Sequence, residues 1–201
     1  QANAYQGEQL ISAVYASNEF GVTEKLKAVL GIRAELFQTY YTGQNQAATE
    51  VYNSAKIIDK LDLFPSANVI YSLTDEENLR GSYSRTTARP SFKEASKSQI
   101  FDAITNRLFI GNIDLTPTYI NNFDLRYERF GEGSEMFAIS AFYKDFTDPI
   151  ELTFYESAPD QITPKNLGSA KVYGVEFEFR KSLGFILDSF KNLKFNINGS
   201  Y

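Results

Sequence analysis

The stretch Thr118–Phe130, TYINNFDLRYERF, constrains the fold of this chain most, because its apolar and polar residues alternate. One face of an extended chain would carry Tyr119, Phe123, Leu125 and Tyr127, and the other Asn122, Asp124, Arg126 and Glu128. A period of two is typical of a β-strand with one apolar and one wet face. A helix would also align Tyr119, Phe123 and Tyr127, but it would leave out Leu125 and would contain several weak helix formers. We therefore predict a strand.

Other stretches of the chain show the same kind of pattern. The further expected strands are Gln9–Glu19, Glu24–Thr39, Leu61–Thr74, Leu79–Pro90, Ser134–Phe146, Leu167–Lys181 and Leu193–Tyr201. A helix is the alternative for Glu24–Thr39, which is rich in good helix formers. Its alternating apolar residues and its central Gly31 favour a strand.

The connections between these strands alternate between short and long. Three of them are long: Thr42–Lys60, Pro90–Pro117 and Thr147–Asn166, the last with a short strand expected at Glu151–Glu156. The short ones include a turn at Gly131–Gly133 and a connector at Ser182–Asn192 that can hold a helical turn. This arrangement places every long loop at the same end of the sheet, as in outer-membrane barrels. The pattern predicts an all-β, antiparallel, up-and-down transmembrane β-barrel.

The composition excludes several classes of function. The chain carries 20 Lys and Arg against 25 Asp and Glu, a net charge of −5, which argues against a nucleic-acid binder. It contains no Cys and no His, so thiol catalysis, Cys/His zinc sites and His-based acid–base chemistry are excluded. We expect neither an enzyme nor a cofactor. No apolar run is long enough for a membrane-spanning helix, but barrel strands need none.

Four short motifs follow one another along the chain. The first is an Arg-Pro-x-Phe element at Arg89, Pro90 and Phe92, and the second is a Gly-Asn-x-x-Leu-x-Pro element at Gly111, Asn112, Leu115 and Pro117. The third is the stretch SAFYKDFTDPIE. The fourth is an Asn-x-Gly-x-Ala-x-x-x-Gly-x-Glu pattern at Asn166, Gly168, Ala170, Gly174 and Glu176. Together these motifs resemble the barrel of TonB-dependent outer-membrane receptors. Each motif is weak alone, and their order makes the resemblance specific.

This resemblance implies a location in the outer membrane of a Gram-negative-type envelope. It also implies import of a scarce ligand (a siderophore, glycan, peptide or vitamin) through a plugged barrel of roughly 22 strands. About eight strands are expected here, so residues 1–201 are interpreted as a central-to-late piece of the barrel, without the plug domain and the other strands. The implied partners are membrane lipid, the rest of the barrel and its plug, the ligand, and an inner-membrane energy-transducing complex that binds an N-terminal part. We expect further strands or another copy to pair with the two edge strands, because unpaired edges are not viable in lipid.

The resemblance and the loop positions suggest candidate contacts with the ligand. The candidates are Arg85, Arg89, Phe92, Asn106, Arg107 and Asn112. Arg85 and Arg89 could contact an acidic ligand at the mouth, or they could be solvated or internally paired at a strand end. Gly111, Asn112 and Pro117 could contact a ligand or set a turn that leads into the next strand.

Two further expectations concern the carboxylates. Asp145, Asp148 and Glu151 carry the oxygen ligands that calcium prefers, but their spacing fits no defined loop, and we expect no metal site. Glu176, Glu178 and Arg180 share the polar face with Asp124, Arg126 and Glu128, and could line the space that a plug fills.

Two alternatives for the function of the protein remain open. One is a self-contained small barrel with a structural or adhesive role, and the other is a soluble lipocalin-like module with Tyr173, Val175, Phe177 and Phe179 pointing inward.

Overall fold

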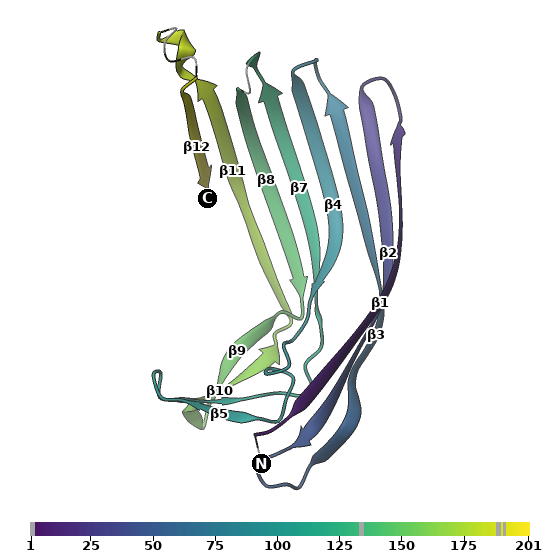
Figure 1. Cartoon of the computed structure of the whole chain (residues 1–201), viewed down its shortest axis with the longest axis vertical. Coiled ribbons are helices and arrows are strands. Elements are labelled where there is room, and N and C mark those ends of the chain that lie inside the picture. Colours follow the sequence, from purple (N-terminus) through teal and green to yellow (C-terminus); the bar gives the residue numbers. More distant parts are fainter. Residues whose placement is uncertain (1–2, 133–134, 188–189, 191) are drawn as a thin grey trace.

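Eight strands form one antiparallel sheet in the computed structural model of this chain, which describes residues 3–132, 135–187, 190 and 192–201. Their order across the sheet is β1-β2-β3-β4-β7-β8-β11-β12 (Figure 1). The bounds are β1 Gln6–Gly21, β2 Leu26–Gln44, β3 Val51–Ser72, β4 Glu77–Ala88, β7 Thr118–Phe130, β8 Met136–Thr147, β11 Ser169–Ser182 and β12 Lys194–Ser200. The expected all-β, up-and-down sheet is confirmed.

The strand predicted from the clearest alternation has the predicted bounds, since β7 begins at Thr118 and ends at Phe130. The helix alternative for Glu24–Thr39 is wrong, because its residues from Leu26 onward lie in β2 and pair with both β1 and β3. Gly133 of the predicted turn and Ser134, the predicted start of β8, lie outside the described residues.

The predicted long loop Thr42–Lys60 is wrong. Here β2 continues to Gln44 and β3 begins at Val51, so only a short turn separates them. The pairing of β2 with β3 contains two register shifts, between Thr39 and Tyr40 and between Tyr41 and Gly43. Beyond the membrane a strand needs backbone pairing but no apolar face, which is why the polar sequence of this stretch looked like a loop.

The other two predicted loops contain strands of their own. A second sheet of four strands has the order β5-β6-β10-β9. Its bounds are β5 Gln99–Asp102, β6 Arg107–Ile110, β9 Ile150–Tyr155 and β10 Ala158–Asn166. The short strand expected at Glu151–Glu156 is confirmed as β9. The remaining three strands were missed because β5 and β6 are four residues each and β10 contains Pro159 and Pro164.

The connector between β11 and β12 contains a helical turn. A 3-10 turn at Leu183–Phe185, capped by the Ser182 side chain, confirms the helical turn expected between β11 and β12. Among the described residues, no helix is long and apolar enough to cross a membrane.

The register of the large sheet places apolar side chains on one face and charged side chains on the other. One row across β4, β7, β8 and β11 contains Tyr83, Phe123, Tyr143 and Tyr173, which we call the aromatic row. Phe177, Phe195 and Ile197 belong to the same apolar face, and they are 44%, 48% and 43% exposed. Apolar side chains that no protein layer covers are expected where hydrocarbon is the solvent. The lipocalin-like alternative requires the opposite orientation.

Both edges of the large sheet are unpaired in the described residues, since β1 pairs only with β2 and β12 only with β11. The eight strands therefore do not close on themselves. The structure contains this chain alone, so the pairing of the edges by further strands or by another copy stays a prediction.

Candidate functional site

The connections at one end of the large sheet join into a single unit, the lower end in Figure 1. This unit, the loop assembly, consists of residues 89–117 and 148–168. A parallel pairing of β6 with β10 joins the two segments. Asn112 Nδ2 donates to the Pro164 carbonyl oxygen at 3.1 Å, and Thr116 N donates to Asn166 Oδ1 at 2.9 Å.

The loop assembly covers the polar face of β2, the face opposite the apolar band. Phe37 and Tyr41 on that face are buried, at 1% and 2% exposure. The Tyr41 hydroxyl accepts a hydrogen bond from Lys97 N at 3.2 Å. Buried residues of the loop assembly include Ala95, Ser96, Ser98, Ile113 and Leu115. The hydrophobic core of this chain thus lies where the loop assembly folds onto the inner side of the sheet.

An ion-pair cluster fixes the start of the loop assembly to the sheet. The Arg89 guanidinium pairs with Glu35 Oε1, and Arg33 Nη2 lies 2.6 Å from Glu35 Oε2. Arg89 Cζ also lies 4.1 Å from the centroid of the Phe37 ring. Glu35 is almost fully buried, with a side-chain exposure of 7%, so its charge depends on these two arginines.

A second ion pair joins the assembly to the turn between β2 and β3. Lys97 Nζ lies 2.9 Å from Glu50 Oε2. The hydrogen bond from Lys97 lowers the pKa of the Glu50 carboxyl, and the bond to Glu50 raises the pKa of Lys97. Next to this pair is a polar hollow of about 340 Å³, and its lining includes Asn45, Gln99, Asn112, Tyr155, Thr163 and Lys165. The hollow opens between the sheet and the loop assembly.

Gly111 allows the loop assembly to pack, and we expect Gly111→Ala to loosen it. A Cβ at Gly111 would lie 2.5 Å from the Ser96 carbonyl oxygen and 2.9 Å from that of Lys93. Such overpacking against backbone typically costs about 1–3 kcal/mol. The measurement is the rate of tryptic cleavage after Lys93 and Lys97 in the intact receptor. Gly81→Ala is the matched control, because a Cβ there meets nothing within 4 Å, and a cleavage rate equal to that of this control would contradict the prediction.

The charged residues on the polar face form a continuous row of ion pairs toward the other end of the sheet. Glu128 accepts from Arg80 at 2.5 Å and from Arg126 at 3.2 Å. Glu178 accepts from Arg126 at 3.2 Å and from Arg180 at 3.1 Å. The shared polar face expected for Arg126, Glu128, Glu178 and Arg180 is confirmed, and their alternating charges neutralise one another across β4, β7 and β11.

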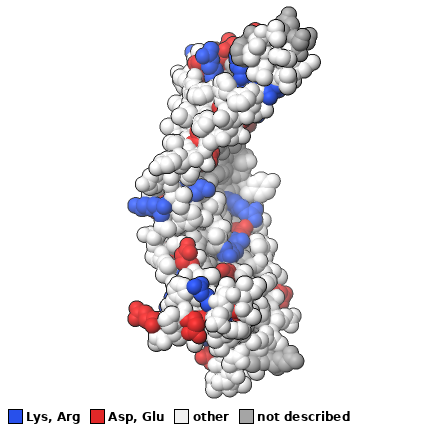
Figure 2. Space-filling model, turned by 90° about the vertical axis from the view of Figure 1, so that its left-hand side faces the viewer, with Lys and Arg blue, Asp and Glu red and all other residues white. Residues whose placement is uncertain are grey.

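Figure 2 shows how charge is distributed along the molecule when it is viewed from the left-hand side of Figure 1. Lys, Arg, Asp and Glu side chains gather at the upper end and over the lower half, and a mostly uncharged zone lies between them. This distribution separates a mostly uncharged zone from two charged ends.

Three of the candidate contact residues already have partners within the protein. Arg85 Cζ lies 4.9 Å from the centroid of the Tyr119 ring, and Arg89 is held by Glu35. Asn112 is bound to Pro164 and accepts from Asp114 N at 3.1 Å. These contacts match the alternative of internally paired arginines and of a turn-setting Asn.

The other three candidate contact residues are exposed, at two places in the loop assembly. Phe92 lies against Gly7 of β1. Asn106 lies in the turn between β5 and β6 with a φ of 54°, and Arg107 Cζ lies 4.9 Å from the centroid of the Phe154 ring. The structure brings Asn106 and Arg107 together on one hairpin and places Phe92 elsewhere. A role in ligand contact stays a prediction for all six candidate residues.

Sequence reasoning missed the residues that hold the loop assembly, chiefly Glu35, Phe37, Tyr41 and Lys97. One signal could have revealed them. Phe37 and Tyr41 are aromatic residues on the face of β2 that also carries Arg33 and Glu35. An aromatic residue on a wet face indicates that another part of the chain covers it.

The carboxylates considered as a cation site do not form one. Among the described residues, no three Asp or Glu side chains are grouped so that they could hold a metal ion. Asp145 lies in β8, whereas Asp148 follows the strand with a φ of 53° and Glu151 lies in β9.

Comparison with protein families decides the identity of this fold. Residues 2–201 match the family model described as "TonB dependent receptor-like, beta-barrel". The chain belongs to the TonB-dependent receptor family. Its resemblance to that family, inferred from four short motifs, is therefore confirmed. No curated protein matches the sequence.

Solved structures of TonB-dependent receptors share the fold. A mutant of the ferric enterobactin receptor of Pseudomonas aeruginosa superposes with a TM-score of 0.65 at 17% identity, over 95% of this chain and 26% of that one. The hemophore receptor of Serratia marcescens, a double mutant in complex with its hemophore and heme, gives a TM-score of 0.68 at 12% identity over 87% of this chain and 32% of that one. The alcaligin receptor of Bordetella pertussis gives 0.57 at 14% identity over 98% and 31%. The chain thus spans about a third of these receptors or less.

Proposed function

We propose that this chain is part of the wall and mouth of a receptor that imports a ligand across the outer membrane. The observation that carries the proposal is the position of the loop assembly. It is fixed to the polar inner face of the sheet through Arg89, Glu35 and Lys97, at the end where the long connections gather. A wall with an apolar outer belt and an inward-folded mouth suits a barrel that retains a solute before passing it on.

The whole receptor would need parts that lie outside this chain. We infer a plug domain within the barrel, further strands, and an inner-membrane complex that supplies energy through the plug. The neighbouring structures are named for siderophores and for a hemophore, and their low identity supports the fold alone. Siderophores, glycans, peptides and vitamins are the ligand classes to test. Within the loop assembly, the exposed Asn106 and Arg107 are the strongest remaining candidates for contact.

The test is ion conductance of the intact receptor in planar bilayers, which needs no knowledge of the ligand. We expect the receptor to be closed, a variant without the plug to conduct, and further replacement of residues 93–115 by a short Gly-Ser linker to raise the conductance. The last increase follows because the loop assembly occupies the mouth. Equal conductance with and without residues 93–115 would show that this segment does not narrow the path.

A further inference from the structure

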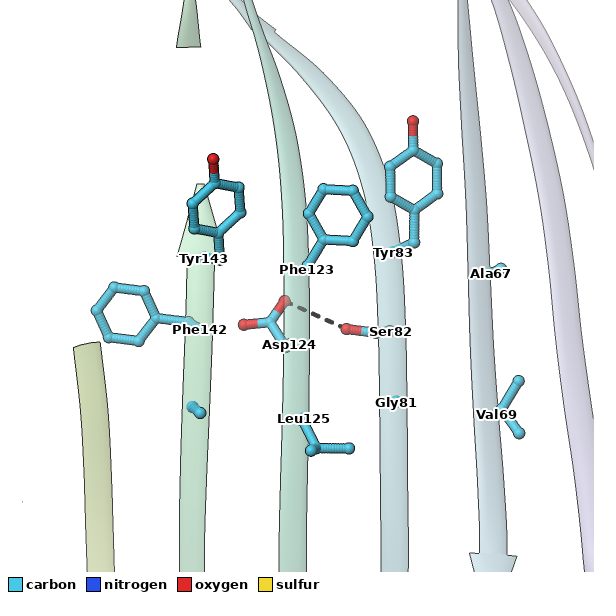
Figure 3. A pocket seen from close by; sticks show the side chains of 11 residues that line it. Ala67, Val69, Gly81, Ser82, Tyr83, Phe123, Asp124, Leu125, Phe142 and Tyr143 are labelled. Atoms are coloured by element: carbon cyan, nitrogen blue, oxygen red, sulfur yellow. Dashed lines mark hydrogen bonds between the residues drawn. The ribbon is translucent and has the colours of Figure 1, made fainter. Parts of the chain in front are cut away.

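The apolar face of the large sheet contains a hollow of about 480 Å³ next to the aromatic row. Its mainly apolar lining includes Ala67 and Val69 of β3, Gly81 of β4, Leu125 of β7 and Ala141 of β8, and Ser82 and Asp124 also border it. Figure 3 shows the rings of Tyr83, Phe123 and Tyr143 standing side by side along one edge of this hollow. The ring centroids of Tyr83 and Phe123 are 5.0 Å apart, and those of Phe123 and Tyr143 are 6.2 Å apart.

The register of the sheet explains the hollow. The row next to the aromatic row pairs Val69 with Gly81, Gly81 with Leu125, and Leu125 with Ala141. Two small residues therefore lie beside large rings, and a Cβ built at Gly81 meets no atom within 4 Å. The depression is open space on the surface.

The outer side of the sheet determines what can fill this space. The loop assembly lies on the opposite face, so neither it nor material inside the barrel reaches the hollow. Water is a poor occupant, because most of the lining is apolar and an apolar hollow with few polar partners holds water poorly. An empty hollow would leave its lining without dispersion contacts on one side. The remaining occupant is the hydrocarbon that surrounds an outer-membrane wall.

A polar row beside the aromatic row supplies a place for a lipid headgroup. Asn121, Asp145 and Lys171 are paired in register across β7, β8 and β11, directly on the loop side of the aromatic row. Lys171 is exposed, and within the described part of the chain no carboxylate oxygen lies within 4.0 Å of its amine. Asp145 is its acidic neighbour in the row. A free ammonium at the level of the membrane interface attracts lipid phosphate.

We propose that the hollow binds one acyl chain of a phosphate-bearing membrane lipid, whose headgroup phosphate is held by Lys171. The chain passes over the Tyr143 and Phe123 rings and rests on Gly81 and Ala141, in contact with Val69 and Leu125. Aromatic residues at a membrane interface with a cation beyond them suit such an amphipathic ligand. This inference concerns the outer wall, and it is independent of which solute the receptor imports.

The test uses the intact receptor in lipid nanodiscs with a phosphatidylglycerol that carries a photoactivatable diazirine on its acyl chain. Mass spectrometry should locate the adducts on peptides of β3, β7 and β8 that line the hollow. Gly81→Leu fills the hollow and should reduce these adducts strongly without unfolding the strand, since the added side chain enters open space. Lys171→Gln should weaken retention of the lipid about fivefold, the effect of roughly 1 kcal/mol per basic residue near an anionic headgroup.

Two controls make the result decisive. Ala34→Leu places the same side chain on the apolar face of β2, outside the hollow, and should leave the adducts unchanged. A diacylglycerol probe with the same chains but no phosphate should be insensitive to Lys171→Gln. Adducts spread evenly over the apolar face and unaffected by Gly81→Leu would overturn the proposal. Protein-to-protein crosslinks across this face would also overturn it, because a second copy of the chain would then be the occupant.

Discussion

Leu125→Arg should destabilise the barrel by about 2–4 kcal/mol, the cost of a basic side chain on the lipid face near the middle of the bilayer. Leu125 lies on the apolar face of β7 and is 54% exposed, with no protein layer over it. In water, an Arg at an exposed strand position would cost little. The size of the penalty therefore measures whether this face meets hydrocarbon.

The matched control is Ser82→Arg on the neighbouring strand. Ser82 lies on the polar face, where its hydroxyl is 3.2 Å from Asp124 Oδ2, so a new guanidinium there gains water and a carboxylate. We expect this variant to stay within about 0.5 kcal/mol of the parent.

Both variants can be compared in the intact receptor by urea-induced unfolding from phospholipid vesicles, with electrophoretic mobility of the unheated protein as the readout of the folded barrel. Similar midpoints for Leu125→Arg and Ser82→Arg would mean that the two faces share one environment. The assignment of an outer apolar belt would then be wrong, and with it the proposed importer and the proposed lipid site.

The transmembrane part of the fold could be predicted from the sequence because lipid imposes a simple rule on it. Alternation is enforced wherever one face meets hydrocarbon, and β7 shows that rule from Asn122 to Glu128. The rule ends at the membrane boundary. The lower parts of β2 and β3 remain paired, for example Tyr41 with Ala55, although their residues are mixed in polarity. Outside the membrane the two faces of a strand need not differ in polarity. The residues there do not alternate, so these parts of β2 and β3 could not be recognised as strands.

The candidate site was predicted less well, since it depends on contacts between distant segments. Arg89 could be recognised as a residue of interest, but its partner Glu35 lies on another strand and is not indicated by any local pattern. The parallel pairing of β6 with β10 joins segments that are separated by three other strands in the sequence. Such contacts follow from how the loops fold back into the barrel, and short motifs do not encode that.

The pair of Arg89 and Glu35 provides the second large expected effect, because the two interpretations of Arg89 predict different results. If Arg89 fixes the loop assembly to the wall, Glu35→Gln and Arg89→Gln should loosen the assembly to a similar extent. The double variant should then be little worse than either single one. We expect a coupling energy of about 0.5–3 kcal/mol, as for contacting residues in one ion-pair network. This is less than the cost of breaking a fully buried ion pair, because the Arg89 side chain is 20% exposed and water screens its charge.

The coupling can be measured through the rate of tryptic cleavage after Lys93 and Lys97, which lie a few residues beyond Arg89. Under conditions where opening is faster than cleavage, this rate follows the population of the loosened loop and so gives its free energy. Arg85→Gln is the control, since Arg85 stacks on Tyr119 and is not part of the Glu35 cluster. If cleavage of Arg89→Gln matches the parent while Glu35→Gln loosens the loop, Arg33 alone satisfies Glu35. Arg89 would then be free to serve the ligand, as its place in the mouth first suggested.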